Sequence, residues 1–137
     1  MIPPANAAKA WLVHEGRVLL LRRRPNDVHQ PSAWDIPGGR LSLGESPHEG
    51  LVREMREEIG ITATIDLPLE IHHFTRQDGQ VITMMVFLCH PQSSDIILSE
   101  EHTEYRWVPV RGDDPAFPDW MHSIVRRYRQ WMGTGAV

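Results

Sequence analysis

The segment "GGRLSLGESPHEGLVREMREEIGI", residues 38–61, joins a glycine-rich loop to an acidic stretch. Four carboxylates, those of Glu49, Glu54, Glu57 and Glu58, fall within ten residues. The apolar residues between them recur at helical spacing, which predicts one amphipathic helix with a dense acidic side.

Both ends of this helix are marked in the sequence. Ser46, Pro47 and Glu49 provide an N-cap, a proline at the first helical position and the glutamate of a capping box. Gly60 follows the last apolar residue and suits a left-handed C-cap. The sequence therefore predicts a helix from Ser46 to Ile59.

Three carboxylates share one side of the predicted helix. At about 100° per residue, Glu54, Glu57 and Glu58 fall within an arc of about 100° next to the apolar stripe. Glu54 and Glu58 repel each other at a spacing of four, and Glu57 and Glu58 lie near the negative end of the helix dipole. A solvated helix face is the simpler interpretation. A bound divalent cation explains the repulsion better, because Mg²⁺ and Mn²⁺ prefer oxygen ligands.

The composition of the chain limits the classes of partner. With 137 residues, 41% of them apolar, the chain can bury a core, and we expect one domain over residues 1–137. The net charge of −4 gives no general attraction to nucleic-acid polymers or to anionic membranes. No segment approaches the roughly 20 apolar residues of a membrane span.

The single cysteine, Cys89, lies inside the apolar run "VITMMVFLC". No internal disulfide can form, and this setting predicts a buried, inert thiol in a reducing compartment. The N-terminal residues also lack the pattern of a secretion signal, so we expect the protein in the cytoplasm.

Strand patterns flank the predicted helix on both sides, and an apolar stripe after Pro118 predicts a C-terminal helix. A short turn containing Gly16 joins the first two strands into a hairpin. The order strands, helix, strands, helix predicts an α/β sandwich. The predicted strands are residues 9–13, 17–22, 61–76, 81–90 and 104–110.

With these residues in place, the opening segment resembles the signature of the Nudix hydrolases, G-x5-E-x7-R-E-U-x-E-E-x-G-U, where U is a bulky apolar residue. Nine specified positions at fixed spacing make a chance match improbable. The resemblance implies an α/β/α sandwich around a mixed β-sheet, and hydrolysis of a phosphoanhydride in a nucleoside diphosphate linked to another group. The matching residues are Gly39, Glu45, Arg53, Glu54, Met55, Glu57, Glu58, Gly60 and Ile61.

The resemblance also implies roles for individual residues. Glu57 and Glu58 look like metal ligands, and Gly39 would add its carbonyl. Glu54 would be either a further ligand or the base that activates water, and Arg53 would orient a glutamate. The implied cofactor is Mg²⁺, with Mn²⁺ as a substitute. Independently, attack on a polyanion needs cations at the phosphate oxygens and a base beside the water, which clustered carboxylates can recruit and supply.

Members of this family often supply one more carboxylate from a loop outside the signature. The stretch "SEEHTEYRW", residues 99–107, offers Glu101 as the first choice of metal ligand and Glu104 as the second. The alternative is that these are solvated loop acids.

The loop "RRPNDVHQPSAWDIPGG", residues 23–39, resembles the corresponding loop of MutT-like nucleoside triphosphate pyrophosphohydrolases. On that mapping Arg24 would contact phosphate and His29 would line the nucleotide pocket, with Arg23 as a weaker candidate. Arg suits phosphate through its fork of donors. A salt-bridged strand end and a surface histidine are the simpler alternatives.

The segment "DDPAFPDW", residues 113–120, precedes the last predicted helix, where MutT-like enzymes hold the base. Asp119 would read base-edge donors while Phe117 or Trp120 stacks on the ring. Asp119 next to Pro118 is also a natural helix cap.

Three functions compete at this point. The first is Mg²⁺-dependent hydrolysis of a nucleoside triphosphate, a small-molecule partner, to the monophosphate and pyrophosphate. The second keeps the chemistry and takes a nucleotide sugar, ADP-ribose or another diphosphate conjugate. The third is a non-catalytic nucleotide-sensing or partner-binding module, which the complete signature argues against. Monomer and homodimer remain open.

Overall fold

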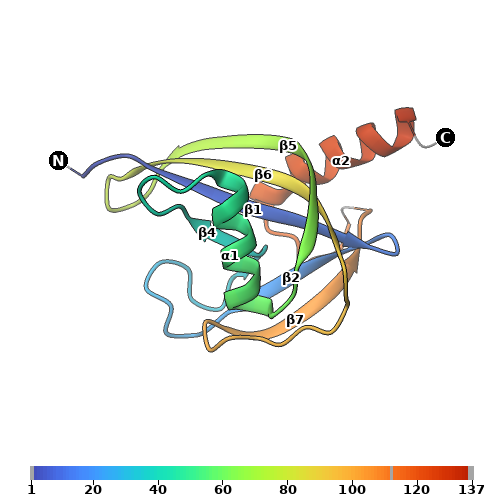
Figure 1. Ribbon diagram of the computed structural model, residues 1–137, viewed down its shortest axis with the longest axis horizontal. Helices are drawn as coiled ribbons and strands as arrows, with labels where there is room; N and C mark the ends of the chain where they lie inside the picture. Colours follow the sequence, from blue (N-terminus) through green and yellow to red (C-terminus); the bar gives the residue numbers. More distant parts are fainter. Residues whose placement is uncertain (1, 112, 136–137) are drawn as a thin grey trace.

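The computed structural model describes residues 2–111 and 113–135, in which seven strands form one mixed sheet (Figure 1). The helices are α1 (Pro47–Ile59), the short 3-10 helix η1 (Asp119–Met121) and α2 (His122–Gly135). The strands are β1 (Ala5–His14), β2 (Arg17–Arg23), β3 (Trp34–Asp35), β4 (Gly38–Arg40), β5 (Ala63–Thr75), β6 (Val81–Pro91) and β7 (His102–Pro109).

Strand β1 lies at the centre of this sheet, whose order is β3-β2-β1-β6-β5. Along one edge it pairs in parallel with β6, from Ala5 opposite Ile82 to Leu12 opposite Cys89. Along its other edge it pairs first with β4 and then with β2, both antiparallel, and β7 pairs with β2. The glycine-rich loop is thereby fastened to the middle of the sheet.

Gly38 allows β4 to lie against β1. Its φ of +125° is disfavoured for other residues, and a Cβ at this position would lie 2.2 Å from the carbonyl oxygen of Ala8. A side chain here would push β4 off the sheet, and with it the loop that leads into α1.

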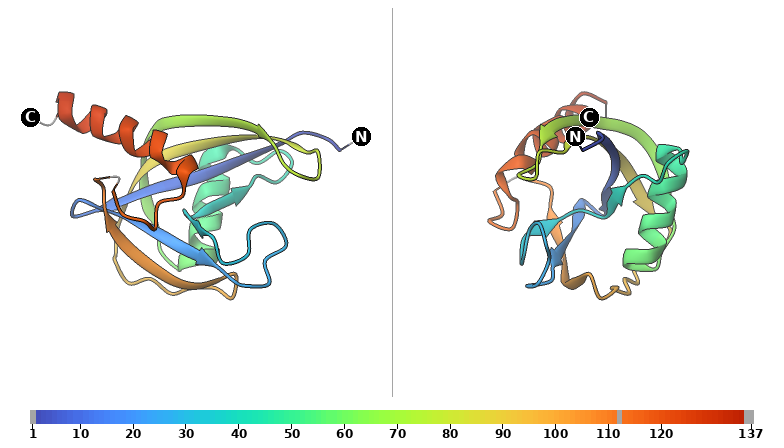
Figure 2. Two further views of the ribbon diagram at one scale, coloured as in Figure 1. Left: turned by 180° about the vertical axis from the view of Figure 1, so that it is seen from behind. Right: turned by 90° about the vertical axis from the view of Figure 1, so that its left-hand side faces the viewer.

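The two helices cover opposite faces of the sheet, as the right-hand view of Figure 2 shows. Along β1 the side chains alternate: Trp11 and Val13 belong to the core under α2, and Ala10 and Leu12 to the core under α1. Two cores on one sheet give the α/β/α sandwich, so the predicted fold class is confirmed.

Helix α1 begins and ends as its sequence predicts. The Ser46 hydroxyl accepts a hydrogen bond from the Glu49 backbone N–H at 3.2 Å, the Glu49 side chain completes the capping box, and Gly60 ends the helix at φ +70°. Met55 and Ile59 are fully buried in the core under α1. This burial fixes the direction in which the acidic side of the helix faces.

The remaining elements match the predictions with two additions. The predicted strands all form, and the C-terminal helix follows Pro118 through η1. The short strands β3 and β4 are new, because two or three residues carry no periodic signal. Cys89 is buried in the core under α1, and burial raises the pKa of its thiol to about 12. Within residues 2–111 and 113–135, no helix is long and apolar enough to cross a membrane.

Candidate active site

Arg53 fastens the glycine-rich loop to α1 through Glu45. Its Nε and Nη2 lie 2.8 and 2.9 Å from the two carboxylate oxygens of Glu45, a bidentate pair. The hydrogen bonds from Arg53, joined by one from the Ser42 N–H, lower the pKa of Glu45 to about 2. Gly50 leaves room for this pair, since a Cβ there would lie 2.9 Å from Glu45 Oε1 and 2.3 Å from Leu41 Cδ2. Glu45 therefore holds the loop in place.

The same guanidinium braces two further glutamates of α1. Arg53 Nη1 lies 3.2 Å from Glu54 Oε1 and 3.3 Å from Glu57 Oε2. The Glu54 carboxylate packs against Gly39, where a Cβ would come within 3.0–3.2 Å of it. Glu57 points outward, with 59% of its side chain exposed.

Burial raises the pKa of Glu54, and the nearby charges of Glu57 and Glu101 add to the effect while Arg53 opposes it. A carboxylate in this setting takes up a proton more readily than one in water.

Glu58 is the most deeply buried acid of the group, at 4% exposed. Its Oε1 accepts a hydrogen bond of 2.7 Å from the Gly38 N–H. Burial nevertheless raises the pKa of Glu58 to about 8, although the charge of Lys9 works in the opposite direction. The Gly38 N–H and Lys9 offset only part of the cost of burying this carboxylate, so a cation bound beside it would stabilise its ionised form.

The loop before β7 is hydrogen-bonded to the C-terminal end of α1. The Ile97 and Ser99 N–H groups donate to the last carbonyls of α1, those of Ile59 and Glu58, each at 3.0 Å. These bonds fix the loop on the C-terminal end of the helix, where free carbonyls need partners. Glu101 and His102 follow directly.

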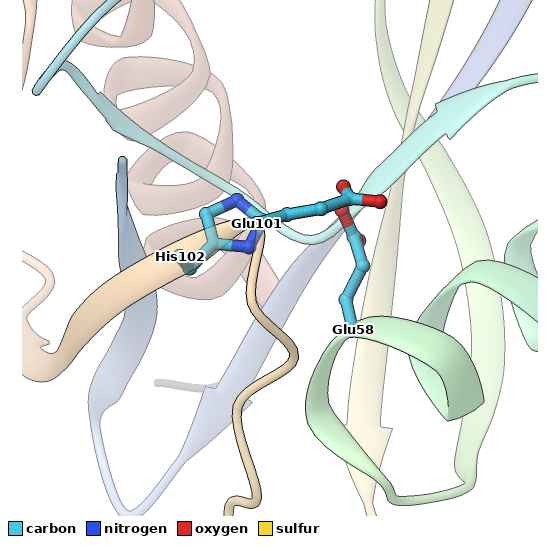
Figure 3. Close-up of side chains that lie close together, drawn as sticks. All are labelled: Glu58, Glu101 and His102. Atoms are coloured by element: carbon cyan, nitrogen blue, oxygen red, sulfur yellow. The ribbon is translucent and has the colours of Figure 1, made fainter. Parts of the chain in front are cut away.

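Glu58, Glu101 and His102 form a compact donor group (Figure 3), with one ligand atom from each lying within 4.8 Å of the others. Glu58 reaches up from the end of α1, while Glu101 directly precedes β7 and His102 is its first residue. Among the described residues, Glu54 and Glu57 lie outside this group. Glu104, the second choice for a loop ligand, instead pairs with Arg22 at 2.9 Å.

These donors fit a divalent cation. Carboxylate oxygens are the ligands that hard cations prefer, and imidazole is a common ligand for first-row metals. Burial lowers the pKa of His102 to about 4, so the ring is neutral near pH 7 and one nitrogen keeps its lone pair. Sequence reasoning missed His102, although it directly follows Glu101 in the loop that was singled out.

A cavity of about 470 Å³ opens on the other side of Gly39. Four cationic side chains and one acid line it, so its electrostatic character favours an anion. Aromatic and histidine rings line the same cavity and offer stacking surfaces. The charged residues are Lys9, Arg23, Arg40, Arg76 and Asp35, and the rings are those of His29, His72, Phe74 and Trp120.

Lys9, Asp35 and Arg23 form an ion-pair network in the wall of this cavity. Lys9 Nζ lies 3.1 Å from Asp35 Oδ2, and Arg23 Nε lies 3.5 Å from the same oxygen. Arg23 Nη1 also lies 3.7 Å from Asp27 Oδ2, so two cations and two carboxylates make up this network.

The structure brings together some of the substrate residues that the sequence indicated and leaves others aside. His29 lines the cavity, but Arg23 does so in place of Arg24. The backbone N–H of Arg24 instead donates to the carbonyl of Glu101 at 3.1 Å.

In the segment before α2, Trp120 lines the cavity and Asp119 does not. Asp119 is exposed and makes no side-chain cap, since Pro118 is the N-cap residue of η1. Phe117 is buried in the core and stacks on Trp11 with centroids 6.0 Å apart, so it is unavailable to a base.

Comparison with known families gives a match over most of the chain. The family model described as the NUDIX domain matches residues 3–128. Among solved structures, the MutT protein from Methanosarcina mazei Go1 superposes with a TM-score of 0.84 at 30% identity, covering 94% of this chain and 95% of that one.

Curated relatives agree with this match. A CTP pyrophosphohydrolase of Escherichia coli is 30% identical over 72% of this chain and 71% of the relative. An octanoyltransferase of Myxococcus xanthus and a MutT-like protein of Streptomyces ambofaciens are 37% and 34% identical over 70% and 69% of this chain. The chain spans only 27% and 56% of the lengths of these last two proteins.

Proposed function

Because this chain belongs to the Nudix hydrolase family, we propose that it hydrolyses a nucleoside triphosphate to the monophosphate and pyrophosphate with the help of Mg²⁺. One observation carries the proposal: Gly39 lies between the acidic group of α1 and the cationic cavity. A triphosphate bound by its nucleoside in the cavity would thus extend toward the carboxylates.

The cavity supplies the binding part of the proposed reaction. Arg23 and Lys9 would attract the phosphates, and Trp120 would stack on the base. The name of the CTP pyrophosphohydrolase relative supports this substrate class.

The carboxylates supply the chemical part. Glu57, Glu58, Glu101 and the carbonyl of Gly39 would hold the divalent cation, which when bound neutralises phosphate oxygens and makes water a better nucleophile. Glu57 would need to turn from Arg53 to join them, since its side chain now points outward.

Glu54 is the proposed base. Its raised pKa and its position against Gly39 suit a group that takes the proton of the attacking water. The water oxygen then forms the new bond to phosphorus, the bridging P–O bond breaks, and the leaving pyrophosphate keeps the electron pair. Arg53 positions Glu54 and touches no substrate in this scheme.

A product assay tests this proposal. Purified protein with Mg²⁺ is given nucleoside triphosphates, nucleotide sugars and ADP-ribose, and the products are separated by ion exchange. We expect monophosphate and pyrophosphate from at least one triphosphate, and a loss of about 10²–10⁴-fold in kcat for Glu54→Gln. Glu100→Gln is the matched control, since Glu100 is an exposed acid beside Glu101. Turnover of a sugar conjugate alone, or nucleotide binding without turnover, would overturn the proposal.

A further inference from the structure

The donor group of Glu58, Glu101 and His102 contains a buried nitrogen whose partner is missing. His102 is only 5% exposed, and its Nδ1 is buried without a hydrogen-bond partner among the described residues. Leaving a buried polar atom unpaired is unfavourable, so such atoms call for an explanation. A ring nitrogen of this residue lies within 4.8 Å of a carboxylate oxygen from each of the two glutamates.

We propose that His102 is a direct ligand of the cation held by Glu58 and Glu101, and that it makes the site prefer Mn²⁺ or a similar transition metal to Mg²⁺. The inference rests on the proposed function, because it concerns the same cation. It adds a nitrogen ligand to a site otherwise made of oxygens.

The spacing allows one ion to reach all three donors. An ion about 2.1 Å from each ligand places opposite ligands about 4.2 Å apart, so donors within 4.8 Å of one another need only small movements to share it. The Ser99 N–H also donates a hydrogen bond to the backbone carbonyl of Glu58, which keeps the loop that carries Glu101 and His102 next to Glu58.

The chemistry of the donors decides which ion is preferred. Mg²⁺ is bound almost entirely by oxygen and keeps several waters, whereas imidazole suits first-row transition metals. A nitrogen donor therefore contributes to Mn²⁺ binding and little to Mg²⁺ binding. The affinity ratio of the two ions measures the contribution of His102.

Calorimetric titration tests the preference without any turnover. Wild type, His102→Gln and the exposed control His90→Gln are each titrated with Mn²⁺ and with Mg²⁺ in the absence of nucleotide. For His102→Gln we expect Mn²⁺ to bind about tenfold more weakly or worse and Mg²⁺ to change by less than about threefold. The control should match wild type. Equal changes for both ions, or none, overturn the inference while leaving the proposed function intact.

A second measurement needs no substitution, in case the His102 variant does not fold. Long-range ¹H–¹⁵N NMR of the wild type during titration with Zn²⁺, a diamagnetic substitute, reports each imidazole nitrogen separately. We expect one His102 ring nitrogen to shift at the first equivalent. An unchanged His102 overturns the inference. Failure of the wild type to bind any divalent ion would overturn both this inference and the metal-dependent function.

Discussion

Replacing Glu58 with Gln is expected to stabilise the metal-free protein while removing its metal site. Glu58 is 4% exposed, and its pKa of about 8 stands above the ordinary value of 4.5. Between these two values the unfolded chain is ionised at this position and the native protein is not, so the free energy of unfolding falls as pH rises through the window. The 2.5 pH units between 4.5 and 7 correspond to about 3 kcal/mol at about 1.36 kcal/mol per unit.

Glutamine removes this loss because it ionises in neither state. Its amide oxygen can still accept the hydrogen bond that the Gly38 N–H now donates to Glu58. We therefore expect Glu58→Gln to exceed wild type in free energy of unfolding by about 3 kcal/mol at pH 7, and to equal it near pH 4.

The assay is urea denaturation in EDTA at several pH values between 4 and 8. Glu57→Gln is the control, since it removes an acid of the same helix whose side chain is 59% exposed, and it should change stability by less than about 0.5 kcal/mol. Adding Mn²⁺ should stabilise the wild type and leave Glu58→Gln unchanged. A Glu58→Gln protein no more stable than wild type at pH 7 in EDTA would refute the reasoning.

Three other predictions follow from the packing and from the cavity. Gly50→Ala should destabilise the protein by about 1–3 kcal/mol, since its Cβ would meet Leu41 Cδ2 at 2.3 Å. Gly133→Ala in α2 should stabilise the protein by up to about 1 kcal/mol, because no atom lies within 4 Å of the added Cβ. Thermal denaturation of the two variants measures both changes. In steady-state kinetics, Arg23→Ala should raise the KM for a triphosphate about tenfold or more and Arg24→Ala much less, because only Arg23 lines the cavity; equal effects would contradict this assignment. The Cys89 thiol should resist iodoacetamide at pH 8 in the folded protein and react in urea, as mass spectrometry would show, because burial holds its pKa near 12.

Local signals made the helix and its loop predictable. The capping box at Ser46 and Glu49 marks one end of the helix and the C-cap at Gly60 marks the other, each through residues at that end alone, and the structure forms both. The role of Gly50 is not local: it leaves space for Leu41 and Glu45, which approach from the preceding loop.

The directions of individual side chains were harder to predict than the ends of the helix. The pairing of β2 with β7 shifts register between Arg22 and Arg23, and a one-residue change in register reverses the two faces of a strand, so the alternation of the sequence alone does not say which neighbouring arginine faces the cavity. The same limit applies to Asp119 and Trp120, which differ by one position at the start of η1. Tertiary packing decides which of two adjacent side chains faces the cavity.

The parallel pairing of β1 with β6 bears on how the chain reaches this fold. Ala5 pairs with Ile82 and Leu12 with Cys89, so the central contact of the sheet closes a loop of more than 70 residues. During synthesis β1 must wait for β6 while its apolar side chains stay uncovered. Contacts so distant along the chain slow folding, and the interval before β6 emerges is the time when the apolar face of β1 is most open to aggregation.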